Sequence, residues 1–382
     1  MLSKIIKIIF SYQTDNVDGK TNQNILACQK ELCIFLNKLG IHCELDLYSL
    51  NKIKKGKNDG MHANLIAFNP KSKGSFIIFQ GHIDTVPAFS THEVVINEKE
   101  IRGRGSVDMK GSLAGTTDAF IEIYHKNYLN YSPILLITAD EEANSFAGIL
   151  NFIKNYKNIL KKTEFVINGE PTNFEVHTGF RGIFGCTIQK KGEEGHSAYP
   201  KKGTVIEDMI PMIKAINKFI IKAKKIKDRK LGDTIGAFTV INSGHKTNQL
   251  PGNFLAGFNL RTVKCFQKYE ILFNELVKRN IPNGSKIEKI SINPISIEIN
   301  SRYRRILTKS FSESGKKLKE GIARYFSEAN ILNRNGIKTI ACGPGDPKLA
   351  HVNPEKEVIK IKDIKKYSEL LQKIMDNLNQ ND

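Results

Sequence analysis

The residues of this sequence that are best suited to chemistry are histidines and carboxylates in five short polar loops. In chain order they are His82 and Asp84, Asp108, Glu141 and Glu142, Glu170, and His351. Imidazole and carboxylate ligands without a thiolate favour zinc, with cobalt or manganese as substitutes. Zinc lowers the pKa of a bound water molecule to about 7, which prepares the water for attack on an amide. The set therefore predicts a metal site with hydrolytic chemistry.

The number of candidate ligands indicates two metal ions, because five ligands are too many for one four-coordinate zinc with an open position. We expect each ion to take one histidine and one terminal carboxylate, with a further carboxylate bridging the two ions. The expected ligands are His82, Asp108, Glu142, Glu170 and His351, and Asp108 is the expected bridge.

Asp84 and Glu141 have predicted catalytic roles beside the ligands. Asp84 lies two residues after His82, so in an extended segment the two side chains share a face and the carboxylate can accept the free imidazole N–H. Glu141 and Glu142 are adjacent and must point in different directions. We assign Glu141 as the general base that takes a proton from water and passes it to the leaving amine. The spacing alone leaves the order of these two glutamates open.

Each of these motifs also has a plain structural interpretation. A His-x-Asp sequence is most often a surface or packing pair, and Asp-Glu-Glu is most often the acidic start of a helix. The glycine-rich segment 103–111 can suggest a phosphate loop, but it lacks the Gly-Lys-Ser/Thr ending of a P-loop. The joint placement of the motifs at the ends of predicted strands favours the metal site.

The apolar runs of the sequence supply the elements that would bring these loops together. Four short runs are continuously apolar, as in strands buried on both faces of a mixed or mainly parallel sheet: residues 76–79, 134–137, 165–167 and 339–342. Predicted helices lie between them, at residues 23–39, 111–127, 145–157 and 359–377. This alternation predicts an α/β fold with a mainly parallel sheet and helices on both faces. In such sheets, ligands bind outside the carboxyl ends of the strands, where the polar loops lie.

The middle of the chain has a different pattern and predicts a small α+β unit inserted into the larger domain. The expected order is strand, long helix, two strands, helix and strand: residues 181–190, 205–226, 234–242, 253–262, 265–279 and 285–292. We therefore predict a discontinuous catalytic domain, residues 1–175 and 294–382, and an inserted domain, residues 176–293. A chain of 382 residues is long enough for two domains.

Composition limits the other classes of function. The net charge of +19 suggests nucleic-acid binding, but only 11 of the 58 basic residues are arginines and the lysines are spread along the chain, so we expect no nucleic-acid partner. No apolar run approaches the roughly 18 residues that span a bilayer, so we expect no membrane association. Residues 1–10 are interrupted by Lys4 and Lys7, which predicts an amphipathic helix. The six cysteines contain no Cys-x-x-Cys pair, which suits a reducing, cytoplasmic location.

Several motifs, in their order along the chain, resemble the M20 metallopeptidase group. They are Gly81-His-Ile-Asp-Thr-Val-Pro87, Gly103-Arg-Gly-Ser-Val-Asp-Met-Lys-Gly111, Ala139-Asp-Glu-Glu-Ala143, Gly169-Glu-Pro171 and Gly195-His-Ser197. The resemblance spans nearly the whole chain and implies a two-zinc hydrolase in which Glu141 is the base and Glu142 a ligand. It also implies that the inserted domain is a lid and, in many members, a dimerisation surface, so we expect a homodimer formed through that domain.

The resemblance also indicates residues that would contact a small N-acyl amino acid substrate. His196 resembles the family histidine that holds the substrate or polarises its carbonyl, often in the partner subunit's site. Asn248 resembles a substrate-contacting asparagine of the family. Arg261 resembles the lid arginine that pairs with a substrate carboxylate, a task that suits a planar bidentate donor.

The choice of substrate depends mainly on Glu328. The segment Ser327-Glu328-Ala329 resembles the Thr-Glu-Ala of acetylornithine and acetylcitrulline deacetylases in this family. Glu328 can pair with a substrate ammonium group or support other residues of the site, and the sequence leaves both open. The implied reaction is the hydrolysis of N-acetylornithine to ornithine and acetate, in arginine biosynthesis. The alternatives are a succinyl-diaminopimelate desuccinylase, a carrier-linked lysine or ornithine hydrolase and, from another class, a non-catalytic binding protein with a retained fold.

Two segments depart from the family pattern. Residues 10–14 replace the usual Pro-Ser near the N-terminus, and residues 244–248 lack the common Gly-Gly pair. Neither segment contains a predicted metal ligand, so the departures concern the substrate and leave the predicted hydrolase chemistry unchanged.

Overall fold

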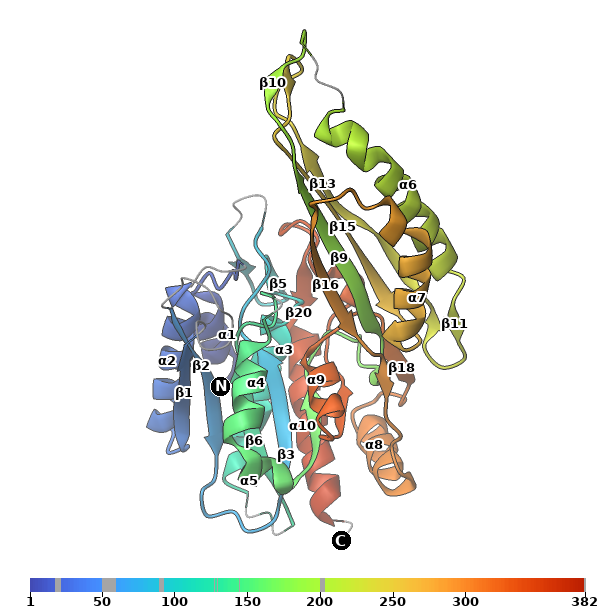
Figure 1. Ribbon diagram of the computed structural model, residues 1–382. Helices are drawn as coiled ribbons and strands as arrows, with labels where there is room; N and C mark the ends of the chain where they lie inside the picture. Colours follow the sequence, from blue (N-terminus) through green and yellow to red (C-terminus); the bar gives the residue numbers. More distant parts are fainter. Residues whose placement is uncertain are drawn as a thin grey trace. The chain divides into compact units, whose positions relative to one another are not determined.

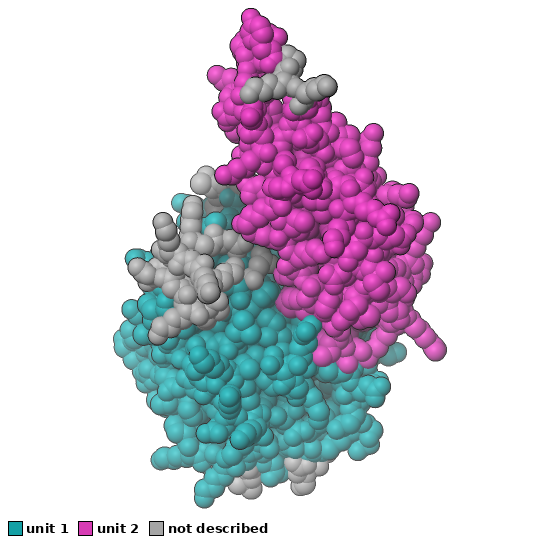
Figure 2. Space-filling view, in the orientation of Figure 1, with its two compact units in different colours: residues 1–178, 297–321, 327–382 teal, residues 179–296, 322–326 magenta. Residues whose placement is uncertain are grey.

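The structure, a computed structural model, describes residues 1–17, 22–49, 60–88, 93–126, 128, 130–143, 145–199 and 203–380. The chain forms two compact units, which Figure 2 shows in different colours. Unit 1 comprises Met1–Thr178, Ile297–Gly321 and Ser327–Asp382, and unit 2 comprises Gly179–Ser296 and Ile322–Phe326. Among the described residues, no helix has both the length and the apolar character that crossing a membrane requires.

The core of unit 1 is a mixed sheet with the strand order β1-β2-β6-β3-β7-β19-β8 (Figure 1). The strands are β1 (Cys43–Ser49), β2 (Met61–Phe68), β3 (Ser75–His82), β6 (Tyr131–Thr138), β7 (Thr163–Asn168), β8 (Val176–Phe180) and β19 (Thr339–Ala341). The central strands β6, β3, β7 and β19 are parallel to their neighbours in that group, whereas the outer pairs are antiparallel. The four apolar runs of the sequence form these parallel strands, which confirms that prediction.

Helices cover both faces of this sheet (Figure 1). One layer contains α1 (Leu2–Phe10), α2 (Gln23–Lys38), α3 (Lys110–Tyr124), α8 (Ser301–Glu313) and α10 (Ile361–Gln380). The other face carries α4 (Ala147–Asn155) and α9 (Glu328–Arg334). Within β3, Ile77 and Phe79 belong to the hydrophobic cluster of the first layer, because alternate side chains of a strand point to one face. The predicted fold class, a mainly parallel sheet with helices on both faces, is confirmed.

The predicted helices agree with the structure within a few residues. The segment 23–39 forms α2, 145–157 contains α4 and 359–377 overlaps α10. The segment 111–127 forms α3, although residue 127 lies outside the described residues. The sequence pattern did not predict β1, β2, α8 and α9, nor a small sheet of β4 (Val95–Ile96), β5 (Glu100–Arg102) and β20 (Val358–Lys360).

Unit 2 contains a four-stranded antiparallel sheet in the order β13-β15-β9-β16, with two helices packed on one face. Its main elements are β9 (Gly182–Lys191), α6 (Val205–Ala223), β13 (Ile235–Ser243), β15 (Asn253–Thr262), α7 (Phe266–Leu276) and β16 (Lys286–Ile292). A capping box of Thr204 and Glu207 fixes the start of α6. All six elements predicted for the inserted segment are present, and its role as a lid stays a prediction.

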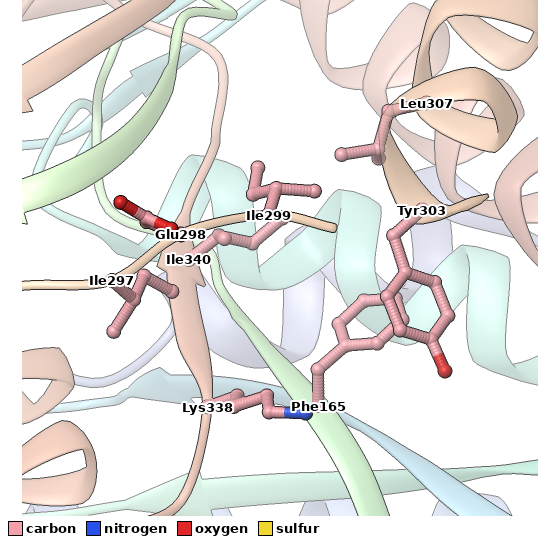
Figure 3. Close-up of a pocket in the computed structure, with 8 residues that line it drawn as sticks. All are labelled: Phe165, Ile297, Glu298, Ile299, Tyr303, Leu307, Lys338 and Ile340. Atoms are coloured by element: carbon pink, nitrogen blue, oxygen red, sulfur yellow. The ribbon is translucent and has the colours of Figure 1, made fainter. Parts of the chain in front are cut away.

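An apolar crevice lies in unit 1, near the amino ends of β7 and β19 (Figure 3). It is lined by Phe165, Ile297, Glu298, Ile299, Tyr303, Leu307, Lys338 and Ile340. None of the histidines or carboxylates that the sequence singled out for chemistry lines it. The crevice is therefore separate from the polar loops, which follow the carboxyl ends of the same strands.

Replacing Phe219 by alanine should destabilise the protein by about 3–5 kcal/mol, because the fully buried ring packs against Phe184 and Phe258 in the core of unit 2. Ile221→Ala is the matched control on the same helix, since this side chain is 53% exposed and should change the free energy of unfolding by less than about 0.5 kcal/mol. Urea unfolding followed by circular dichroism measures both variants. Equal losses of unfolding free energy in the two variants would contradict the packing described for α6.

Candidate metal centre

The residues that the sequence singled out as ligands, base or histidine partner all lie in unit 1. His82 ends β3 and Asp84 follows it, Asp108 precedes α3, Glu141 and Glu142 follow β6, Glu170 follows β7, and His351 lies beyond β19. Because parallel strands end at the same edge of a sheet, these loops meet there. The fold thus brings together residues that are far apart in the sequence.

Two groups of side chains share Asp108. The Nε2 atom of His82 is 3.3 Å from Asp108 Oδ1 and 3.8 Å from Glu170 Oε1. The Nε2 atom of His351 is 3.2 Å from Asp108 Oδ2 and 3.0 Å from Glu142 Oε1. The candidate ligand atoms of each group lie within 4.8 Å of one another. The two carboxylate oxygens of Asp108 therefore face different histidines, and each group contains one imidazole and two carboxylates.

The loop that carries Asp108 is held by Glu357, which the sequence analysis did not identify. Glu357 Oε1 accepts hydrogen bonds from the backbone N–H groups of Val107, at 3.1 Å, and Asp108, at 3.4 Å. Its other oxygen accepts a hydrogen bond of 2.5 Å from the guanidinium of Arg104. The peptide bond between Asp108 and Met109 is cis. Glu357 is fully buried, so this contact fixes the backbone on which Asp108 stands.

The ring of His82 is oriented by the Asp84 loop. Its Nδ1 atom lies 2.9 Å from the backbone oxygen of Asp84 and 3.6 Å from Asp84 Oδ1. We expected the carboxylate to accept the imidazole N–H, but the backbone oxygen is the nearer acceptor. Asp84 Oδ2 accepts hydrogen bonds from Asn16 Nδ2, at 3.0 Å, and from the N–H of Glu142, at 3.1 Å, and these contacts hold the carboxylate with Oδ1 beyond hydrogen-bond distance of the ring. With Nδ1 directed to Asp84, the Nε2 atom of His82 faces Asp108.

The carboxylates of this cluster repel one another. Burial raises the pKa of Glu141 well above its ordinary value, and the charges of Glu142 and Glu170 raise it further, while His82 opposes the shift. Burial likewise raises the pKa of Glu170 well above its ordinary value, and Asp108 adds to the rise. Positive charge in the cluster would lower the free energy of the ionised carboxylates.

The two histidines beside Asp108 lower its pKa, whereas burial and neighbouring carboxylates raise the pKa of Glu141 and Glu170. Burial alone would raise the pKa of Asp108, but its contacts with His351 and His82 lower it below its ordinary value. Burial opposes protonation of His351, yet Asp108 and Glu142 raise the pKa of that imidazole to about 10. In this state the histidine protons supply the positive charge that the carboxylates require.

The residues fit a pair of divalent cations. Asp108 Oδ1 is buried and accepts no hydrogen bond of good geometry from the described residues. The available donors are imidazole nitrogens and carboxylate oxygens, a set that suits zinc and related ions. A cation in place of the histidine protons would satisfy both the unpaired oxygen and the surplus of carboxylates.

Glu141 and Glu142 occupy different places in the cluster. Glu142 Oε1 contacts His351 in one of the two groups that contain Asp108. Glu141 lies with His82 and Glu142 in a third group that does not include Asp108. Its side chain is nearly buried, with 8% of the residue exposed. The two neighbours therefore differ in their relation to Asp108, although both have an oxygen in the group that contains His82.

Glu328 lies in a buried polar layer and not at an exposed surface. The residue is 0% exposed, and one oxygen accepts hydrogen bonds from Thr138 Oγ1, at 2.7 Å, and from Gln80 Nε2. Asn168 Nδ2 donates to Gln80 Oε1 at 2.5 Å. Gln80 and Asn168 each lie two residues before a metal-ligand candidate, His82 or Glu170, on the same strand or its continuation. Of the two roles left open for Glu328, this placement favours the support of site residues over contact with a substrate.

The three other substrate-contact candidates lie in unit 2. His196 is exposed in the short strand β10 (Gly195–His196), which pairs with β14 (Gln249–Leu250). Asn248 directly precedes β14, and its backbone oxygen accepts a hydrogen bond of 3.1 Å from the N–H of Ser197. His196 and Asn248 are therefore close together on one ribbon. Arg261 is partly buried near the end of β15, where its neighbours in register are Ile183 and Ile235.

The residues around Asp140 were not predicted from the sequence. Asn16, Tyr48 and His62 come from three separate segments and all donate to the Asp140 carboxylate. Asp140 could have been noticed because it precedes the two glutamates. Nothing in the spacing of Tyr48 or His62 indicates that they belong to the site.

Two histidine–carboxylate groups that share one aspartate, at the carboxyl edge of an α/β sheet, are arranged as in metal-dependent hydrolases. Residues 78–377 match the sequence profile of Peptidase family M20/M25/M40, so the chain belongs to this family. It is a hydrolase of the M20 metallopeptidase group, and the family predicted from the motifs is confirmed.

Known relatives differ in the acyl group that their names describe. A succinyl-diaminopimelate desuccinylase of Magnetococcus marinus is 30% identical over 252 residues, 62% of this chain and 62% of that protein, which is less than two thirds of its length. An acetylornithine deacetylase of Buchnera aphidicola subsp. Schizaphis graminum is 28% identical over 323 residues, 78% of this chain and 82% of that protein. An M20 family metallo-carboxypeptidase from Sulfolobus solfataricus has the same fold, with a TM-score of 0.75, 19% identity and 98% of each chain covered.

Zinc should raise the melting temperature more at about pH 7 than at about pH 5. In the metal-free protein, burial raises the pKa of Asp84 to about 6 and that of Glu328 to about 7. The stability that these protonated groups provide is complete below their ordinary pKa and is lost as the pH rises through the raised values. Zinc offsets the resulting negative charge. Differential scanning calorimetry with zinc and with a chelator measures the difference, and an equal zinc effect at both pH values would contradict this electrostatic account.

Proposed function

We propose that this chain is a two-metal amidohydrolase that removes the acyl group from an N-acyl amino acid, with N-acetylornithine as the substrate. The observation that carries the proposal is the division of the Asp108 oxygens between His82 and His351. The names of the two curated relatives, a deacetylase and a desuccinylase, both describe the removal of an acyl group. The reaction would belong to arginine biosynthesis in the cytoplasm.

In this proposal five residues hold the metal ions. His82 and Glu170 would bind one ion, His351 and Glu142 the other, and Asp108 both. Two divalent ions in such a site polarise the amide carbonyl and lower the pKa of a water molecule. We propose zinc as the native metal, with cobalt as a substitute, because the donors are nitrogen and oxygen atoms only.

Glu141 would be the general base. Its carboxylate lies within the cluster but outside both groups that contain Asp108, so it is available for proton transfer. We propose that Glu141 takes a proton from the attacking water and gives it to the leaving amine. Burial and neighbouring carboxylates raise the pKa of Glu141, which suits a group that must both accept and release a proton. Asp84 would keep the His82 ring in the orientation that this chemistry needs.

Unit 2 would supply the contacts to the rest of the substrate. We propose that Arg261 binds the substrate carboxylate, and that His196 and Asn248 bind the amide or its neighbours. A homodimer through unit 2 is supported by the edge strand β13, which pairs only with β15 among the described residues. Ile235, Val240 and Ile241 of this strand are 39–54% exposed, and an exposed apolar edge strand favours pairing with a second chain.

Glu141→Gln tests the base separately from the ligands. The substitution keeps the shape of the side chain and removes the proton acceptor, so kcat should fall by at least about 100-fold while both metal ions remain bound. Amine release from N-acetylornithine and elemental analysis of the same sample measure the two quantities. His82→Ala is the contrasting variant, because it should lose metal and activity together. A Glu141→Gln protein that loses metal would show that the roles of Glu141 and Glu142 are exchanged.

N-acetylornithine should be cleaved with a higher kcat/KM than N-succinyl-diaminopimelate. The succinyl substrate brings one more carboxylate to a site that already holds several, and repulsion between like charges lowers its affinity. Because Glu328 is buried, we expect Glu328→Gln to lower the activity on N-acetylornithine and on N-acetylmethionine by the same factor. A larger loss on N-acetylornithine would mean that Glu328 contacts the ornithine ammonium group. Faster cleavage of the succinyl substrate would assign the enzyme to the desuccinylases and leave the metal chemistry in place.

A further inference from the structure

The loop that carries Glu141 and Glu142 starts from an unusual backbone conformation. Asp140 has a φ of 70°, in the left-handed region that residues with side chains rarely adopt. Its backbone oxygen accepts hydrogen bonds from the N–H of Phe146, at 2.8 Å, and from Ser145 Oγ, at 3.2 Å. The direction in which the two glutamates leave β6 therefore depends on how Asp140 is held.

The Asp140 side chain is held by three donors. Asp140 Oδ2 accepts a hydrogen bond of 2.8 Å from the hydroxyl of Tyr48, in β1. Asp140 Oδ1 is 2.8 Å from Nδ1 of His62, in β2, and accepts a hydrogen bond of 2.9 Å from Asn16 Nδ2, in the segment after α1. All four residues are at most 4% exposed. A buried carboxylate that receives three hydrogen bonds has one position and one orientation.

Asn16 also connects this carboxylate to the other side of the cluster. Its side-chain amide donates to Asp84 Oδ2 at 3.0 Å, and the same oxygen accepts a hydrogen bond from the N–H of Glu142. The backbone N–H of Asn16 donates to the oxygen of Thr85 at 2.8 Å. One amide group thus links the loop of His82 with the loop of Glu142.

We infer that Asn16, Tyr48 and His62 are positioning residues of the hydrolase, which act through Asp140 to place Glu141 and Glu142 relative to His82. The inference rests on the proposed function of these two glutamates. None of the three donors belongs to the ligand groups; Tyr48 comes from the edge strand β1 and His62 from the neighbouring strand β2. Their common target is the residue directly before the base, so they control its distance from the water it deprotonates.

A misplacement of about 1 Å at a catalytic group can cost about 100-fold in rate, and loss of an outer contact of a metal ligand typically costs about 10–100-fold in metal affinity. The hydrogen bonds around Asp140 should therefore affect both metal affinity and kcat. A purely structural network would affect only the stability of the fold.

Tyr48→Phe, with Tyr156→Phe as its matched control, tests this inference. Each variant removes one hydroxyl that donates to a carboxylate in unit 1, but Tyr156 donates to Glu44, at 3.2 Å, away from the loops of the site. We expect Tyr48→Phe to weaken binding of the weaker zinc ion by about tenfold in a competition with a chelator, and Asn16→Ala to weaken it by about 10–100-fold. Tyr156→Phe should leave the zinc affinity within about twofold. Equal zinc affinities of the two Tyr→Phe variants would overturn the inference.

A double-mutant cycle shows whether the effect passes through Glu141. At saturating zinc, Asn16→Ala should lower kcat on N-acetylornithine by about tenfold or more with little change in KM. In the Glu141→Gln background the same change should lower kcat by less than about twofold, because the base that it misplaces is already absent. An equally large loss of kcat in the Glu141→Gln background would mean that Asn16 acts through a residue other than Glu141. If the unmodified protein cleaves no N-acyl amino acid, the proposed function fails, while the zinc competition still decides the role of the three donors.

Discussion

The site depends on one electrostatic constraint: several carboxylates are buried together, and in the described residues two imidazoles, those of His82 and His351, lie among them to balance their charge. Burial, followed by the neighbouring carboxylates, raises the pKa of both Glu141 and Glu170 well above the ordinary range. Asp108 lies between the two histidines, and one of its oxygens accepts no hydrogen bond of good geometry within the part of the chain that the structure describes. Such an arrangement raises the free energy of the folded protein alone, and bound cations lower that free energy. The two-metal proposal follows from this balance.

Contacts outside the cluster fix the strands and loops that carry the carboxylates. Parallel strands bring His82 and Glu170 to one edge of the sheet, and Glu357 and Asp140 fix the two loops that carry the other carboxylates. In both loops the contact is made by a buried acidic side chain that takes part in several hydrogen bonds. The repulsion among the carboxylates is thus maintained by the surrounding structure, which is the condition for tight binding of divalent ions.

The sequence predicts the metal cluster because most of its members occupy the same kind of place relative to the predicted strands. All the candidates except Asp108 stand at or after the end of a run of apolar residues, and a parallel sheet brings such places together without further information. Asp108 stands in a glycine-rich loop that leads into α3. The burial of Glu328 could not be predicted, because the same motif suits a substrate contact or a supporting role. Tyr48 and His62 could not be predicted either. They belong to strands that the sequence analysis missed, and their contact with Asp140 exists only after those strands pair with the parallel group.

The central claim is that Asp108 lies between two divalent ions. The most direct measurement is X-ray diffraction from crystals grown with zinc, recorded on both sides of the zinc absorption edge. We predict two anomalous peaks in the cluster, one beside His82 and Glu170 and the other beside His351 and Glu142, with one oxygen of Asp108 next to each. A single peak, or two peaks of which neither adjoins Asp108, would contradict this account.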